Sequence, residues 1–256
     1  MSENNSPIPT APKGAGTHGI GWIEIRANNL EASGMFYQEV FGWEIESFTP
    51  AYKVFKVAAG GPNGGLRGAS PAGTPACTPY IFASDVAMAQ TQVVAAGGKK
   101  LTEPENIGGG WIGHFAAPNG VIYGLADSPI HQPHIPAPFG AGPKPGVNSL
   151  CSLEMYGGPD LAATGQFFQD LFGWASFDSM PGYRMFDAGV SIGGVFQGHT
   201  PGTTSIAYIY VSDVAAKLTE IEDAGGKRMG EPMGMPGVTF GYFTDPSGTA
   251  MGLIGP

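Results

Sequence analysis

Residues 36–43 read Phe36-Tyr37-Gln38-Glu39-Val40-Phe41-Gly42-Trp43, and residues 167–174 nearly repeat them as Phe167-Phe168-Gln169-Asp170-Leu171-Phe172-Gly173-Trp174. Three further pairs of segments match at a separation of 128 residues: Ser84-Asp85-Val86 with Ser212-Asp213-Val214, Ala96–Lys99 with Ala224–Lys227, and Pro118-Asn119-Gly120 with Pro246-Ser247-Gly248. A register kept over this distance indicates a duplicated domain, since about 110 residues can close a core of their own.

Composition narrows the class of protein and its partners. Of the 256 residues, 42% are apolar and 13% are charged, against about 25% charged in an average soluble domain, so large buried surfaces are expected. The net charge of −9, with no cluster of Lys and Arg, argues against binding to nucleic acid. No apolar run approaches the roughly 20 residues of a membrane span, and the N-terminus lacks the features of a signal peptide.

Two cysteines, Cys77 and Cys151, occupy unrelated positions in the two halves and have no CxxC spacing. They are expected to be free thiols in a cytoplasmic protein. The sequence is compatible with either a monomer or a homodimer.

Pro and Gly mark the domain boundaries. Residues 1–17 predict a mobile tail, and residues 129–147, with six prolines and no periodic apolar pattern, predict an extended linker. The first domain is therefore expected at 18–128 and the second at 148–256.

Each half alternates between strand and helix periodicity. In the first, residues 22–26 predict a strand, a helix capped by Asn29 and ended by Gly42 follows, and three more strands lie within 43–66. This βαβββ unit recurs from residue 80 and twice in the second half. The predicted class is α+β.

Four βαβββ units together with the repeated motifs resemble the vicinal oxygen chelate superfamily, which includes glyoxalase I, extradiol dioxygenases, fosfomycin-resistance enzymes and bleomycin-binding proteins. The resemblance covers nearly the whole chain. It implies two tandem domains, each of two units that form a cupped mixed sheet, with helices on the outer face and ligands in the cups. It does not imply one reaction, because a fold of this kind hosts many.

The resemblance also implies positions for a divalent metal ion, normally held by His and Glu on the inner face of a cup. The corresponding positions here are Trp22 and Ser152, Pro79 and Ala207, Gly124 and Gly252, and a fourth near Leu66 and Val195. These side chains cannot replace two imidazoles and two carboxylates. No metal and no cofactor are therefore expected.

One acidic residue repeats on the predicted inner face. Glu24 and Glu154 follow Trp22 and Ser152 by two residues, so strand alternation turns both carboxylates into the cups. A buried carboxylate needs partners or a raised pKa. Two interpretations stay open: structural pairing, of Glu24 with Arg26 and of Glu154 with Tyr156 or backbone donors, or a functional role as base or hydrogen-bond acceptor.

His114 is the one histidine on a predicted strand, and Tyr242 aligns with it, so His114 is a candidate catalytic residue beside Glu24 and Glu154. The other histidines, including His131, fall in the predicted tail, linker or loops. Trp22 and Trp111 could stack on a flat ligand. The candidate ligand-binding residues are Trp22, Arg26, Trp111, Ser152, Tyr156 and Tyr242.

Three functional hypotheses follow. The favoured one is a metal-independent enzyme, similar to a lyase, isomerase or hydroxylase, that acts by acid–base chemistry on a hydrophobic, aromatic or carbonyl-bearing small metabolite. The alternatives are a protein that binds and sequesters such a compound without chemistry, and a metal-dependent lyase or dioxygenase with an atypical site. The differences between halves, Trp22 against Ser152 and His114 against Tyr242, favour one specialised site and hence an enzyme.

Overall fold

The computed structural model describes residues 18–57, 60–68, 75–128, 131, 145–189, 191–199 and 205–256. The predicted tail lies outside the described residues, as does most of the predicted linker. Within the described part of the chain, no helix is long and apolar enough to cross a membrane.

Among its described residues, the first half contains two α-helices and nine strands. They are β1 (Ile20–Arg26), α1 (Leu30–Phe41), β2 (Glu44–Thr49), β3 (Tyr52–Lys56), β4 (Asn63–Arg67), β5 (Cys77–Phe82), α2 (Val86–Ala95), β6 (Lys99–Lys100), β7 (Glu105–Asn106), β8 (Trp111–Ala116) and β9 (Ile122–Ala126).

The second half repeats this order. Its elements are β10 (Leu150–Tyr156), α3 (Leu161–Phe172), β11 (Ala175–Met180), β12 (Tyr183–Asp187), β13 (Gly194–Gln197), β14 (Ser205–Tyr210), α4 (Val214–Asp223), β15 (Lys227–Arg228), β16 (Met233–Met235), β17 (Val238–Thr244) and β18 (Ala250–Gly255).

The repeated motifs form the ends of the helices. The Asn29 side chain accepts a hydrogen bond from the Ala32 amide at the start of α1, and Asp85 does the same for α2. Gly42 and Gly173 end α1 and α3 with φ angles of 67° and 72°, in the left-handed region that glycine adopts without strain.

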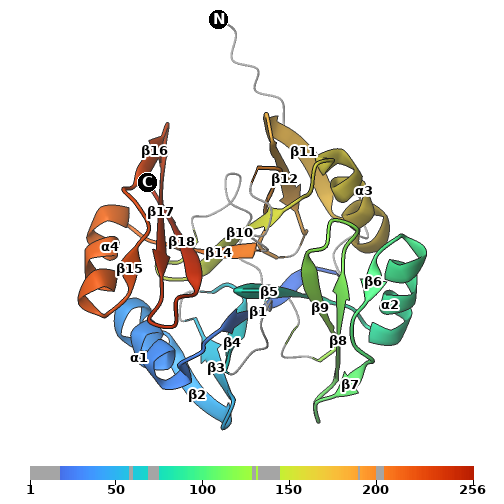
Figure 1. Ribbon diagram of the computed structural model, residues 1–256, viewed down its shortest axis with the longest axis horizontal. Coiled ribbons are helices and arrows are strands. Elements are labelled where there is room, and N and C mark those ends of the chain that lie inside the picture. Colours follow the sequence, from blue (N-terminus) through green and yellow to red (C-terminus); the bar gives the residue numbers. More distant parts are fainter. Residues whose placement is uncertain are drawn as a thin grey trace, which may run out of the picture.

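Each half forms one mixed sheet, in the strand orders β2-β3-β4-β1-β5-β9-β8-β6 and β11-β12-β13-β10-β14-β18-β17-β15. The two βαβββ units of a half join through the antiparallel pairs β1–β5 and β10–β14. The helices lie at the outside of the molecule, and the two sheets lie between them (Figure 1). The predicted α+β class and tandem cupped sheets are confirmed.

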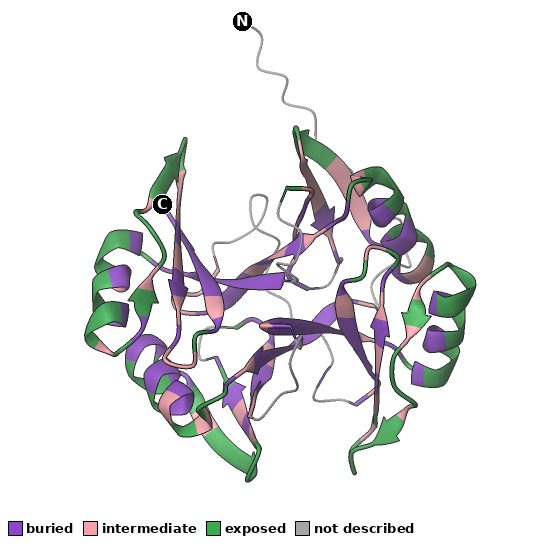
Figure 2. Cartoon of the chain, viewed as in Figure 1, coloured by how far each residue is buried: buried purple, intermediate pink, exposed green. Residues whose placement is uncertain are grey.

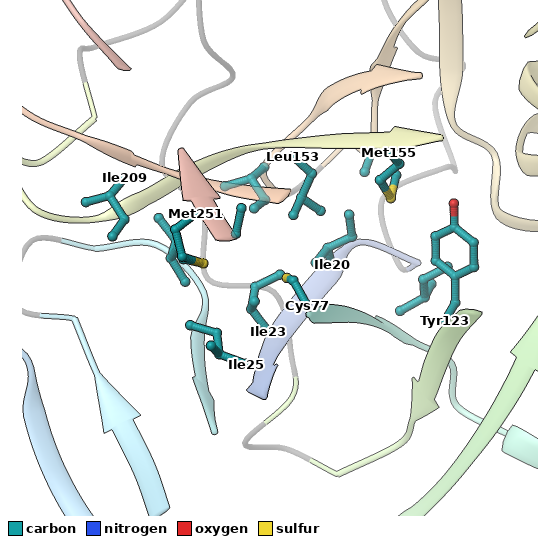
Figure 3. Close-up of a cluster of buried hydrophobic side chains, with 14 of the residues drawn as sticks. Ile20, Ile23, Ile25, Cys77, Tyr123, Leu153, Met155, Ile209 and Met251 are labelled. Carbon is teal, nitrogen blue, oxygen red and sulfur yellow. The ribbon is translucent and has the colours of Figure 1, made fainter. Parts of the chain in front are cut away.

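The two halves share one core, although each half was expected to close its own. A single cluster of buried side chains includes Ile23 and Ile25 of β1 together with Leu153 and Met155 of β10 (Figure 3). These strands face each other with their apolar sides, and Figure 2 shows that the central strands are the most buried part of the molecule. The halves bury more apolar surface together than separately, which favours a shared core.

The two tryptophans of the repeated motif connect the halves. Trp43 Nε1 donates a hydrogen bond to the Asn148 carbonyl at 2.7 Å, and Trp174 Nε1 donates to the His18 carbonyl at 2.8 Å. Both indoles are 1% exposed. The motif therefore fixes the sheets relative to each other and leaves their concave faces to carry the site.

Candidate functional site

A cavity of about 450 Å³ lies on the concave face of the first sheet, which we call the first cup. Residues of seven strands (β1, β2, β3, β4, β5, β7 and β8) and of segments outside them line it, among them Trp22, Glu24, Phe48, Tyr52, Val54, Arg67, Tyr80, Ile112 and His131. The mixture of aromatic rings with a few polar groups is typical of a small-molecule site.

Strand alternation places Glu24 on the floor of this cavity. Ile23 and Ile25, its neighbours along β1, belong to the shared core, so Trp22 and Glu24 point to the other side. Glu24 is 6% exposed. Its orientation is the one that the sequence predicts.

The cation that pairs with Glu24 is Arg67, not Arg26. Arg67 Nε lies 2.7 Å from Glu24 Oε1, and the Tyr80 hydroxyl donates to Oε2 at 3.4 Å. The Tyr52 hydroxyl is a third hydrogen-bond partner. Arg26 is opposite Arg67 in the parallel β1–β4 pair. This pairing brings Arg67 close to Glu24, although the two residues are far apart in the sequence.

Two glycines make room for these tyrosines. A Cβ atom at Gly65, the residue opposite Glu24 in β4, would overlap the Tyr52 ring, and one at Gly124 would overlap the ring of Tyr80. The glycines thus let two rings lie flat over the strands and direct their hydroxyls to Glu24.

Burial raises the pKa of Glu24 above its ordinary value, while the charge of Arg67 and the hydrogen bonds of Arg67, Tyr52 and Tyr80 lower it in part. Burial and the nearby charge of Glu24 raise the pKa of both tyrosines, so their hydroxyls stay protonated. The cup therefore holds a basic carboxylate beside two neutral hydroxyl groups.

His114 continues the hydrogen-bond chain from Glu24. Its Nε2 lies 2.8 Å from the Tyr80 hydroxyl, and its Nδ1 lies 3.4 Å from Thr102 Oγ1. Burial and the charge of Arg67 lower the pKa of His114 to about 4, so the ring is neutral near pH 7. The structure thus brings His114 together with Glu24 through Tyr80, a residue that was not among the predicted site residues.

His131 is a second residue that the sequence did not assign to the site. Its ring packs edge-on against Trp22, with centroids 4.8 Å apart, and stacks on Tyr80 at 6.1 Å. It is 4% exposed, and burial lowers its pKa to about 4. Its surroundings are rich in proline, which predicted a linker and gave no signal of a pocket residue.

Trp111, predicted to bind ligand in the cup, lies on the other face of the sheet. It is 45% exposed and lines a hollow beside Asp85, at the start of α2. Residues three apart on a strand face opposite sides, so Trp111 and His114 cannot both enter the cup. Ile112, one residue on, is the side chain of β8 that lines the cavity with Trp22.

The concave face of the second sheet, the second cup, has a related but different cluster. The Tyr208 hydroxyl donates to Glu154 Oε2 at 2.6 Å, and the Tyr242 hydroxyl lies 3.3 Å from the same oxygen. These two tyrosines, and not Tyr156, are the hydroxyl donors to Glu154. Ser152 is opposite Tyr208 in the β10–β14 register, as Trp22 is opposite Tyr80.

The residues in the two cups differ from the set of His and Glu that the resemblance implies for a divalent metal ion. Trp22 is opposite Tyr80, Tyr80 is opposite Gly124, and Gly124 is opposite His114 in the sheet. Tyr80 therefore occupies the position in the cup at which Pro79 was expected. In the second cup, Tyr208 and not Ala207 occupies the corresponding position. Tyr208 is opposite Ser152, and residues opposite each other on adjacent strands point to the same face of the sheet. The described residues hold no group of three or more His, Cys, Asp or Glu that could bind a metal.

Comparison with known proteins finds relatives by sequence and neighbours by fold. No protein-family model matches the chain. The "Putative glyoxylase CFP32" of Mycobacterium bovis is 27% identical over 253 residues, which cover 92% of this chain and 94% of that protein; the protein of the same name in Mycobacterium tuberculosis matches equally.

Two solved structures are similar over most of their length. The Mn(II)-bound glyoxalase of Novosphingobium aromaticivorans aligns with a TM-score of 0.67 at 18% identity, covering 93% of this chain and 82% of that one. The 2,3-dioxygenase LapB of Pseudomonas sp. KL28 aligns with a TM-score of 0.65 at 17% identity, covering 94% and 92%. At these identities the similarity shows the fold alone.

Proposed function

The chain has the vicinal oxygen chelate fold in tandem form, and on that premise we propose that its first cup is the active site of a metal-independent enzyme. It acts by acid–base chemistry on a small aromatic or carbonyl-bearing metabolite. The observation that carries the proposal is the buried Glu24 carboxylate on the floor of a cavity of about 450 Å³, with two protonated tyrosine hydroxyls beside it.

Glu24 has the properties of a general base. Its raised pKa brings its basicity closer to neutral pH, where proton transfer is most efficient, and Arg67 keeps the ionised form accessible in spite of burial. In this role Glu24 removes a proton from a carbon next to a carbonyl group of the substrate.

The tyrosines and His114 have complementary roles in the proposal. Once Glu24 has taken the proton, a hydroxyl of Tyr52 or Tyr80 that donated to its carboxylate is released to donate instead to the substrate oxygen on which negative charge has developed. Tyr80 also links Glu24 to the neutral His114 ring, at 3.4 Å and 2.8 Å, so a proton can move along this chain. Trp22 and His131 provide ring faces and edges against which a flat substrate packs.

A binding protein is the second candidate, and one observation favours it. Glu24 already has three partners, Arg67, Tyr52 and Tyr80, and a carboxylate so fully engaged can serve as a fixed acceptor for a ligand without moving a proton.

Trp22 offers a direct way to find the ligand. It lines the first cup, so a compound that enters this cup should change tryptophan fluorescence, and the change should be absent in Trp22→Phe. A panel of aromatic and carbonyl-bearing metabolites is titrated first, and each compound that binds is then tested for turnover.

Glu24→Gln distinguishes enzyme from binder. An enzyme should keep its fold and ligand binding in this variant but lose about a hundredfold or more in kcat. Glu103→Gln, the same change at a side chain that is 86% exposed, is the matched control. Wild-type turnover by Glu24→Gln, or a loss confined to Glu154→Gln, would refute the assignment, and binding without turnover of any compound would favour the binder.

A further inference from the structure

The two cups differ in charge at one matched position. Arg67 is opposite Tyr52 in the β3–β4 register, and Gln197 is opposite Tyr183 in the corresponding β12–β13 register. The position of Arg67, the cation that pairs with Glu24 in the first cup, is therefore occupied in the second cup by Gln197, which has an uncharged amide. Across the described ranges, none of the ion pairs includes Glu154.

The partners that Glu154 does have are neutral. Both Tyr208 and Tyr242 hydrogen-bond to its Oε2, and their hydroxyls lie 2.6 Å from each other. Burial first, and then the charge of Glu154, raises the pKa of Tyr208 well above its ordinary value, so this hydroxyl stays protonated. The hydroxyls fix the carboxylate without cancelling its charge.

The rest of the second cup is aromatic and apolar. Tyr208 and Tyr210 form a buried cluster with Ile206 and Ile254, and Phe240 and Tyr242 pack against it. The counterpart of the bulky Trp22 is Ser152, and Glu154 is only partly buried where Glu24 is buried. The carboxylate is therefore within reach of a ligand, and the rings around it attract positive charge.

We propose that the second cup is a separate binding site for a small organic cation, an ammonium group carried on an apolar body. Glu154 Oε1, the oxygen that the two tyrosines do not use, is the counter-ion, and the rings of Tyr208 and Tyr242 contact the apolar substituents on nitrogen. The site depends on the second cup alone and is independent of any chemistry in the first.

The test compares choline with 3,3-dimethyl-1-butanol, its neutral isostere, by isothermal titration calorimetry on the full chain. Choline should bind at about one site per chain, and the isostere should bind about tenfold more weakly or worse, since desolvated cation–π and ion-pair contacts are worth more than about 1.4 kcal/mol. Trp22 fluorescence should stay unchanged when choline is added, because the occupied site is the second cup.

Two variants assign the site. Glu154→Gln removes the counter-ion, and Gln197→Arg places a guanidinium where the first cup has Arg67; each should weaken choline binding about tenfold or more while the melting temperature shows that the chain is folded. Glu24→Gln should leave choline binding unchanged. Equal affinity for the two probes, no binding of choline, or binding that survives Glu154→Gln would overturn the proposal, and loss of binding only in Glu24→Gln would place the cation in the first cup.

Discussion

Replacement of Arg67 by Met should destabilise the protein through Glu24. Removing one partner of a fully buried ion pair costs about 3–5 kcal/mol, because the other charge remains buried and unpaired. Here the side chain of Glu24 is 7% exposed but that of Arg67 is 39% exposed, so water already screens part of the interaction and the expected cost is about 2 kcal/mol at neutral pH. For a chain of 256 residues this lowers Tm by roughly 4–8 °C.

The dependence of this effect on pH identifies its cause. Folding raises the pKa of Glu24 above 4.5, so the contribution of Glu24 to the stability of the folded state is greatest below that pH, where Glu24 is protonated, and is lost as pH rises through the folded-state pKa. Loss of Arg67 raises the pKa further and deepens the fall. The deficit of Arg67→Met should therefore be largest at neutral pH and small as pH approaches 4.5.

Chemical denaturation at several pH values measures the effect. The double variant Arg67→Met/Glu24→Gln should recover most of the lost stability and lose the pH dependence. Lys56→Met, which breaks an exposed ion pair with Glu46, is the control and should leave the stability nearly unchanged. A deficit for Arg67→Met that is the same at all pH values, or that persists in the double variant, would refute the proposed role of Glu24 as a buried charge held by Arg67.

Two further predictions concern the sheets. Gly124→Ala should displace the Tyr80 ring and weaken ligand binding in the first cup. Gly252→Ala crowds Tyr208 instead and should affect the second cup. Equal effects of both variants on ligand titrations followed by Trp22 fluorescence would contradict this separation. Cys77 and Cys151 are buried, and burial raises the pKa of Cys77 to about 12. The native chain should therefore not react with a thiol reagent at mildly alkaline pH, whereas both thiols of the denatured chain should react. Rapid reaction of the native chain would show that the shared core opens.

The sequence predicted the order of helices and strands because the residues that begin and end helices act locally. Asn29, Asp85 and Gly42 act on the helix that follows or precedes them, and the duplication gave each prediction twice. The orientation of Glu24 and Glu154 followed from strand alternation, which is also local.

The partners of those carboxylates depend on strand pairing, which single-strand patterns do not encode. Arg67 reaches Glu24 through the parallel β1–β4 pair, and Tyr80 enters the cup because it, and not Pro79, is opposite Trp22. If a position on a strand is assigned one residue too early or too late, the side chain is predicted on the wrong face of the sheet. An error of this kind also placed Trp111, instead of its neighbour Ile112, in the cup. Nothing in the Pro-rich context of His131 indicated its contact with Trp22.

The central claim is that the cups work without a metal ion, and elemental analysis of the purified chain tests it most directly. Glu24 is paired with Arg67, His114 is hydrogen-bonded to Tyr80, and the described residues contain no group of three or more His, Cys, Asp or Glu that could hold a metal ion. The account predicts far less than one Zn, Ni, Fe or Mn ion per chain, and ligand binding in the first cup that is unchanged by a chelator. About one tightly bound transition-metal ion per chain, lost together with ligand binding on chelation, would contradict it.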